Sequence, residues 1–202
     1  MPATELPNLE VRPPRERILS TAHDLFYQEG IRATGIDRVI AESGVSKVTF
    51  YRYFPSKNEL ILAFLAHRHE RWMAWFTDAL QRHGADRGKG IDALVPALAE
   101  WLAAPTFRGC AFINSVGELG GALPEVVEIA RNHKRDMVGA IADLLPASRR
   151  RTKDAQAIGV AVDGAIVQAQ FEAGAEAALA ALGRLVKSLL INPVKAPLKT
   201  PA

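Results

Sequence analysis

The 202-residue chain is long enough to bury a full core, either as one large domain or as a small module joined to a larger one. Hydrophobic residues make up 49% of it and charged residues 23%, a balance that argues against a disordered or a membrane-spanning chain. The net charge is only +3, so affinity for nucleic acid would have to come from local clustering of cations. The single cysteine, Cys110, excludes an intrachain disulfide and a cysteine-rich zinc site.

The first 13 residues contain acids and prolines rather than a basic region followed by an apolar run. This composition does not match a secretory signal, and the lone cysteine is compatible with a reducing compartment. We therefore expect a flexible arm over residues 1–13 and a cytoplasmic protein with no membrane partner.

Three helices are predicted in the next forty or so residues. The first begins at Pro13 and Pro14 and ends at Gly30, with apolar residues at helical spacing between them. Thr34 and Asp37 resemble a capping box for a short second helix that ends at Gly44. Ser46 can cap a third, which runs to about Tyr53 because Pro55 follows.

A long fourth helix is predicted to follow this trio. Ser56 and Glu59 form another capping box, and one face then stays apolar from Leu60 to Leu80, over about six turns. A helix of this length can connect two modules without a flexible linker.

The remainder is also helical in pattern. Helices are predicted over about 91–103, 124–145, 152–173 and 175–191, with a less regular stretch at 107–119. The proline-containing residues 192–202 are expected to form a disordered tail. The prediction is an all-α fold of about nine helices, with a helix-turn-helix module at 14–57 and a larger helical domain at 58–191.

The segment Gly44 to Phe54 carries the chemistry of a helix-turn-helix. Its glycine permits a tight turn, and a slim helix with one polar face fits a DNA major groove. At about 100° per residue, Phe50 and Phe54 project opposite Val48 and Arg52. One face is therefore predicted to pack while the other meets DNA.

The positive charge near this segment is local. Residues 44–57 contain three cations and no acid, whereas residues 1–60 contain eight cations and eight acids. Hydroxyl groups and the amides near Ser46 add neutral donors of the kind that commonly contact phosphate oxygens.

The stretch "ATGIDRVIAESGVSKVTFYRYFPSKNEL", residues 33–60, resembles the DNA-binding signature of the tetracycline-repressor-type (TetR) family. Residues 107–119, "FRGCAFINSVGEL", are similar to a segment in some ligand-binding domains of that family. The resemblance implies a transcriptional repressor with no cofactor. Its implied partners are operator DNA, a second copy of the chain bound through the last two helices, and a largely apolar small-molecule effector held by the domain at 58–191.

The resemblance also implies roles for individual residues. The base contacts fall on Lys47 and Val48. The phosphate or backbone contacts fall on Thr34, Ser46, Thr49, Tyr51, Arg52, Tyr53 and Lys57.

Candidates for the effector pocket come from the aromatic residues after the module and from the segment around Cys110. They are Trp72, Phe76, Trp101, Phe107, Cys110, Phe112 and Ile113. The alternative for the aromatic residues is plain core packing, and for Cys110 it is a small buried hydrophobe.

Other features have ordinary explanations. The residues His67, His69, Glu70 and His83 are interpreted as a solvated helix face rather than a metal site. The run Arg149–Arg151 with Lys153 is interpreted as a charged loop. Small residues of the last two helices suit a dimer interface or a core equally; they are Ala157, Ala161, Ala165, Ala169, Ala177 and Ala181.

A second hypothesis gives the chain a different function, as a thiol-based redox regulator or a small helical thiol enzyme that uses Cys110. It lacks support because no second cysteine, Ser/His/Asp order or phosphate-binding loop is present. We therefore expect a protein that is not an enzyme.

Overall fold

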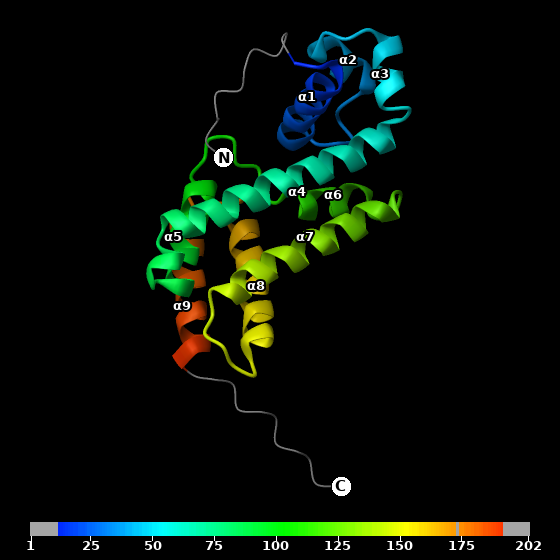
Figure 1. The fold of residues 1–202 in the computed structure, drawn as a ribbon. Helices are drawn as coiled ribbons and strands as arrows, with labels where there is room; N and C mark the ends of the chain where they lie inside the picture. Colours follow the sequence, from blue (N-terminus) through cyan, green and yellow to red (C-terminus); the bar gives the residue numbers. More distant parts are fainter. Residues whose placement is uncertain (1–11, 173, 192–202) are drawn as a thin grey trace.

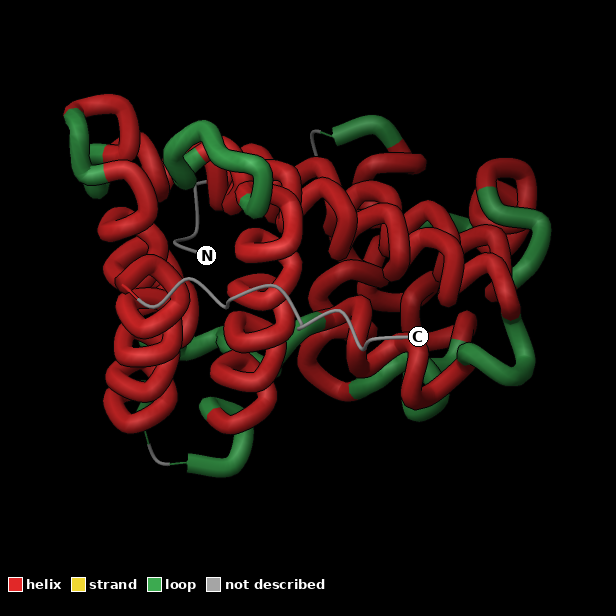
Figure 2. The backbone as a smooth tube through the Cα atoms, turned by 90° about the horizontal axis from the view of Figure 1, so that it is seen from below, coloured by secondary structure: helices red, strands yellow, loops and turns green. Residues whose placement is uncertain are grey.

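The computed structural model describes residues 12–172 and 174–191, and this described part consists of helices and loops without any strand (Figures 1 and 2). The expected C-terminal tail and most of the N-terminal arm lie outside it. No helix among the described residues is both long enough and apolar enough to cross a membrane.

The first three helices form a small bundle at one end of the molecule (Figure 1). They are α1 (Pro14–Glu29), α2 (Ile36–Ser43) and α3 (Lys47–Tyr53), and each packs against the other two. A proline stands in the first turn of α1, where its missing N–H costs nothing, and the helix ends at Gly30 with φ of 95°. These bounds confirm the three predicted helices.

The capping box predicted for α2 is wrong. Gly35, not Thr34, is the N-cap residue, and no side chain caps the helix. The Thr34 hydroxyl instead donates to the Gly30 carbonyl oxygen at 2.9 Å. The hydroxyl thus holds the turn between α1 and α2.

The long helix α4 (Lys57–Arg82) leaves the bundle and crosses to the far end of the molecule (Figure 1). The Ser56 hydroxyl accepts from the Glu59 amide at 3.1 Å, which confirms the predicted cap. Every apolar residue of the predicted face is buried, and so is Arg68 in the middle of it. A cation inside an apolar face was not anticipated.

The larger domain is built around α4. Two short 3-10 turns, η2 (Ala85–Arg87) and η3 (Gly90–Ala93), lead into α5. The helices that follow are α5 (Leu94–Leu102), α6 (Ala111–Leu119), α7 (Pro124–Asp143), α8 (Arg151–Gln168) and α9 (Glu176–Ile191). Helix α7 packs against α4, α6 and α8, while α9 packs against α5 and α8.

Two expectations for this domain need correction. Residues 107–119 contain a regular helix, α6, because Ala111, Phe112 and Ser115 are buried at helical spacing. The helix expected over 152–173 ends at Gln168, and turns follow it. The basic run near residue 150 opens α8, and its Arg151 side chain donates to the Ala142 carbonyl and pairs with Asp143.

Candidate nucleic-acid interface

Local contacts determine where helix α3 begins. Gly44 ends α2 with φ of 63°, a conformation that side chains rarely adopt, and this permits the tight turn. The Ser46 hydroxyl then accepts from the Thr49 amide at 3.1 Å and lies 2.8 Å from the Thr49 hydroxyl. Ser46 therefore caps α3 as predicted, although the bond occupies part of its hydrogen-bonding capacity.

The two faces of α3 differ as the helical spacing predicts. Phe50 has no exposed surface and Phe54 only 3%, whereas the Val48 side chain is 74% exposed. The Phe50 and Phe54 rings lie 6.2 Å apart, which places them together in the module core. Lys47, Tyr51, Arg52 and Tyr53 are exposed on the outer surface. The helix thus presents a polar and cationic face to solvent.

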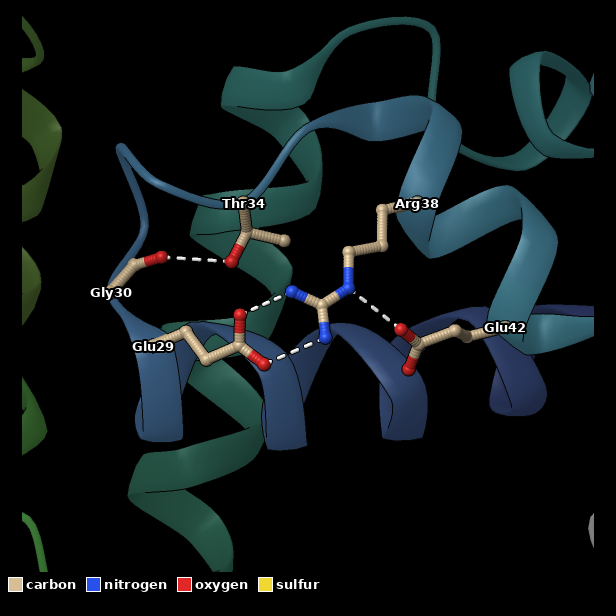
Figure 3. A network of polar contacts seen from close by, with 5 residues as sticks. All are labelled: Glu29, Gly30, Thr34, Arg38 and Glu42. Atoms are coloured by element: carbon tan, nitrogen blue, oxygen red, sulfur yellow. Dashed lines mark hydrogen bonds and ion pairs between the residues drawn. The ribbon is translucent and has the colours of Figure 1, made fainter.

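A network on α2 fixes the angle between α1 and α2. Figure 3 shows Arg38 between Glu29 and Glu42, with the guanidinium facing both carboxylates. Its Nε donates to Glu42 at 2.7 Å, and its terminal nitrogens donate to both Glu29 oxygens. These carboxylates raise the pKa of Arg38 above its ordinary value. No sequence pattern pointed to this network, which ties α2 to the end of α1.

Besides Ser46 and Thr49, three further candidate phosphate or base contacts have partners within the chain. The Lys47 ammonium lies 3.5 Å from Asp37, and both side chains are exposed, so the pair can open at little cost. Lys57 donates to the Ile31 carbonyl oxygen at 2.7 Å, and burial lowers its pKa. Thr34 has no exposed surface, so its side chain does not reach a phosphate in this conformation. That expectation for Thr34 is corrected because its hydroxyl serves the α1–α2 turn.

The module is joined to the larger domain by a second set of bonds, which the sequence did not reveal. The Glu118 carboxylate on α6 accepts from the amides of Ile31 and Arg32, at 3.4 and 2.9 Å. The Tyr27 hydroxyl on α1 donates to the Gly109 carbonyl at 2.9 Å and accepts from the Arg108 amide at 3.0 Å. The end of α1 therefore moves with the segment that leads into α6.

A small cavity lies inside the larger domain. Four of the seven predicted pocket residues line it: Trp72, Trp101, Cys110 and Phe112. Phe107 instead lines an outer groove, while Phe76 is fully buried and lines neither space. Ile113 is half-buried and also lines neither. The cavity wall contains Arg68, His133 and Lys134, which the sequence analysis did not select.

The histidine prediction needs revision. His67 and His69 are half-buried instead of solvated, and the Nδ1 atoms of His69 and His133 lie 3.2 Å apart. Burial, with help from the positive charge of Lys134, lowers the pKa of His133 to about 2, so His133 is neutral at physiological pH. His83 bonds to Glu100 at 2.6 Å. No group of three potential metal ligands occurs among residues 12–172 and 174–191.

Cys110 is 3% exposed, which agrees with the interpretation as a small buried residue. It lies at the N-terminus of α6, with Lys134 and Arg68 near its sulfur atom. Burial keeps bulky reagents away from this thiol in the described conformation, and this weakens the thiol-enzyme hypothesis.

Comparison with known proteins adds independent findings. Residues 18–64 match the family model described as "Bacterial regulatory proteins, tetR family". The transcriptional activator FasR of Mycolicibacterium smegmatis is 32% identical over 88 residues, which is 44% of this chain and 40% of FasR. The alignments to the first curated relatives span between 19% and 40% of those proteins.

Solved structures extend the similarity over nearly the whole chain. SCO4454, a TetR-family transcriptional regulator from Streptomyces coelicolor, is 29% identical with a TM-score of 0.76. The match covers 87% of this chain and 95% of SCO4454. The multidrug binding protein EbrR, solved with malachite green, has the same fold with a TM-score of 0.64 and 21% identity, over 85% of this chain and 96% of EbrR.

Proposed function

We propose that the chain is a TetR-type transcriptional regulator, a homodimeric repressor that a small-molecule effector releases from operator DNA. The match of residues 18–64 to the family model and the similarity to SCO4454 support this proposal. A regulator of this kind acts where the DNA lies, so the proposal includes a cytoplasmic location.

The observation that carries the proposal is the division of α3 into two faces. Its aromatic residues anchor it in the module, and this leaves Lys47 and Val48 exposed near its N-terminus, where a recognition helix contacts base edges. We assign the base contacts to these two residues. The phosphate or backbone contacts are assigned to Ser46, Thr49, Tyr51, Arg52, Tyr53 and Lys57.

The dimer is proposed to form through the outer faces of α8 and α9. Val160 on α8 is 74% exposed and Leu185 on α9 is 52% exposed, although the two helices pack against each other. Ala157, Ala177 and Ala181 are also exposed, so close approach of a second copy is sterically allowed. Ala165, in contrast, is buried within the subunit.

The release mechanism is proposed to use the bonds between α6 and α1. A ligand that shifts α6 would also shift Glu118 and the partners of Tyr27, and so change the position of the module. A changed separation of the two recognition helices no longer fits successive major grooves.

Selection of bound fragments from a random DNA library tests the DNA-binding and dimer claims together. We expect a two-fold symmetric site whose half-sites lie about 10 base pairs, or a multiple of that, apart. Absence of any enriched sequence would overturn DNA recognition, and enrichment of a single unpaired half-site would overturn the dimer. Val160→Glu should weaken dimerisation in sedimentation measurements, whereas Asn132→Glu on the exposed face of α7 should not.

The sign of regulation is tested with the selected site placed between a promoter and a reporter gene. A repressor lowers reporter output when the protein is expressed. Higher output would instead assign the role by which FasR is named, that of an activator.

A further inference from the structure

The internal cavity is lined by side chains from five helices, with Trp101 contributed by α5. Arg68 and Trp72 come from α4, Phe112 from α6, Lys134 from α7 and Ile166 from α8. Aromatic rings form much of the wall, as expected of a core, but the wall also contains an arginine. The charge of that arginine is the feature that needs an explanation.

Arg68 is 4% exposed, and no carboxylate pairs with it among the residues that the structure describes. Its Nη1 donates to His23 Nε2 at 3.1 Å, and its Cζ lies 4.0 Å from the centre of the Tyr27 ring. These contacts orient the guanidinium. His23 Nδ1 bonds in turn to the exposed carboxylate of Asp24 at 2.9 Å, so the imidazole ring stands between that carboxylate and Arg68. A guanidinium stays protonated in proteins, so the core holds a positive charge without a directly bonded carboxylate among the described residues.

The other polar groups of the wall do not neutralise that charge. Lys134 is paired with Asp163, and burial keeps His133 neutral. The Trp72 indole N–H is buried and has no acceptor among the described residues. Two residues of the wall therefore have polar groups that lack a matching partner among the described residues: Arg68 has no directly bonded carboxylate, and the Trp72 N–H has no acceptor.

We propose that this cavity binds an organic anion, whose carboxylate pairs with Arg68 and accepts the Trp72 N–H while its apolar body lies against the surrounding rings. The inference rests on the proposed function, since it names the chemical class of the effector. It revises the expectation of a largely apolar effector, because a neutral apolar molecule would leave the Arg68 charge uncompensated.

Space for the apolar body requires side-chain movement. The cavity has a volume of about 10 Å³, enough for one water molecule, whereas the groove outside has a volume of about 370 Å³. Trp101 lines the cavity and Phe107 lines the groove, and their rings meet edge to face at 5.3 Å. Displacement of Phe107 joins the two spaces and admits a ligand from outside.

The same guanidinium connects the cavity to the DNA-binding module. His23 and Tyr27 both belong to α1, and Tyr27 also bonds to Gly109 and Arg108. A carboxylate that draws Arg68 toward the cavity weakens its contacts with α1. The bound anion therefore affects the contacts between Tyr27 on α1 and the segment that leads into α6, and these contacts position the module.

The test uses the full-length protein and two carboxylate probes, benzoate and octanoate, each with its matched neutral amide and its matched amine. Binding is followed by tryptophan fluorescence and by thermal unfolding, because Trp72 and Trp101 line the cavity. We expect the carboxylates to bind, and the amides and amines to bind at least tenfold more weakly. Equal binding of an amide, preference for an amine, or no binding by either carboxylate overturns the proposal.

Substitutions test whether Arg68 and Trp72 cause the preference for carboxylates. Arg68→Gln should abolish the preference for carboxylates, and Arg68→Lys, which keeps the charge if the first variant fails to fold, should retain part of it. Trp72→Phe should weaken carboxylate binding several-fold. Arg135→Gln on the exposed face of α7 is the matched control and should bind as the wild type does. Unchanged carboxylate preference in both Arg68→Gln and Trp72→Phe overturns the assignment.

DNA binding by the ligand-free protein separates this proposal from the proposed function. If the protein binds its selected DNA fragment but no carboxylate, the anion proposal fails and the regulator stands. If it binds carboxylates but no DNA sequence, the proposed function fails, and the anion site is then not an effector site. Release of the selected DNA by a bound carboxylate supports both.

Discussion

The exposed cations of the DNA-binding module contrast with one buried cation of the larger domain, Arg68. Lys47 and Arg52 stand on the surface of α3, while Arg38 is exposed and neutralised by two carboxylates. Arg68 in the larger domain is buried and has no carboxylate partner among the described residues. An exposed cation suits a polyanion that approaches from solvent, whereas a buried one suits a ligand that enters the fold.

The DNA-binding module and the larger domain also differ in the packing that stabilises them. The module depends on a short helix anchored by two aromatic rings, and the larger domain on long helices packed around α4. This contrast can be tested by substitutions in each part.

Truncation of the α3 anchor should have the largest effect. Phe50→Ala removes a fully buried ring and should lower the free energy of unfolding by about 3–5 kcal/mol. Val48→Ala, on the exposed face of the same helix, should change it by less than about 0.5 kcal/mol. Chemical denaturation of both variants measures the difference. Comparable losses would mean that the two faces of α3 are not distinct.

Acid should destabilise the larger domain through His133. Its pKa is about 2 in the folded chain and 6.5 in the unfolded chain, so the neutral form is favoured by folding. The stabilisation is complete above pH 6.5 and is lost as pH falls toward 2, by about 1.4 kcal/mol per pH unit. Denaturation of wild type and His133→Leu between pH 7.5 and 4.5 measures this. Parallel pH profiles for the two proteins would remove His133 as the cause.

Loss of the Lys47 ammonium should weaken DNA binding without loss of stability. Lys47→Ala should cost about 1–3 kcal/mol of affinity for the selected fragment, as for a base contact. Its side chain is exposed, so the unfolding free energy should stay within about 0.5 kcal/mol of wild type. Fluorescence anisotropy titrations give the affinity, with Lys89→Ala as a control cation remote from α3 in the chain. If both variants bind as wild type does, the base contact lies elsewhere.

Removal of the α3 cap should have the smallest effect of the four. Ser46→Ala deletes the acceptor of the Thr49 amide and should lower stability by about 1 kcal/mol. Ser46→Thr keeps a hydroxyl acceptor and should recover most of that loss. Thermal unfolding distinguishes them, and an alanine variant as stable as wild type would show that packing alone holds α3.

The sequence was most informative where structure depends on neighbours along the chain. Helical spacing placed Phe50 and Phe54 opposite Val48, and cap residues located the starts of α3 and α4. The sequence prediction failed at Thr34. Its hydroxyl could either cap α2 or bond back to the Gly30 carbonyl, and the turn geometry favours the bond to Gly30.

Tertiary packing decided the remaining features. Within residues 107–119, Ala111–Leu119 form a helix that packs against α7 and α4, and its Glu118 then reaches the amides that follow α1. His69 and His133 meet although 64 positions separate them. Side chains this far apart in sequence share no local pattern.

By itself, then, the sequence determined an all-α chain, the start and the two faces of the recognition helix, and a family resemblance that the comparisons confirmed. Only the tertiary structure decided that Arg68 is buried. Arg68 has the helical spacing of Phe64 and Trp72 on α4, but that spacing alone did not predict a buried cation. Whether a carboxylate bonds directly to Arg68 depends on the residues of α1, α6 and α7 that surround it, and among the described residues none does. Charge compensation in a core is decided by three-dimensional neighbours, which the sequence pattern of one helix does not reveal.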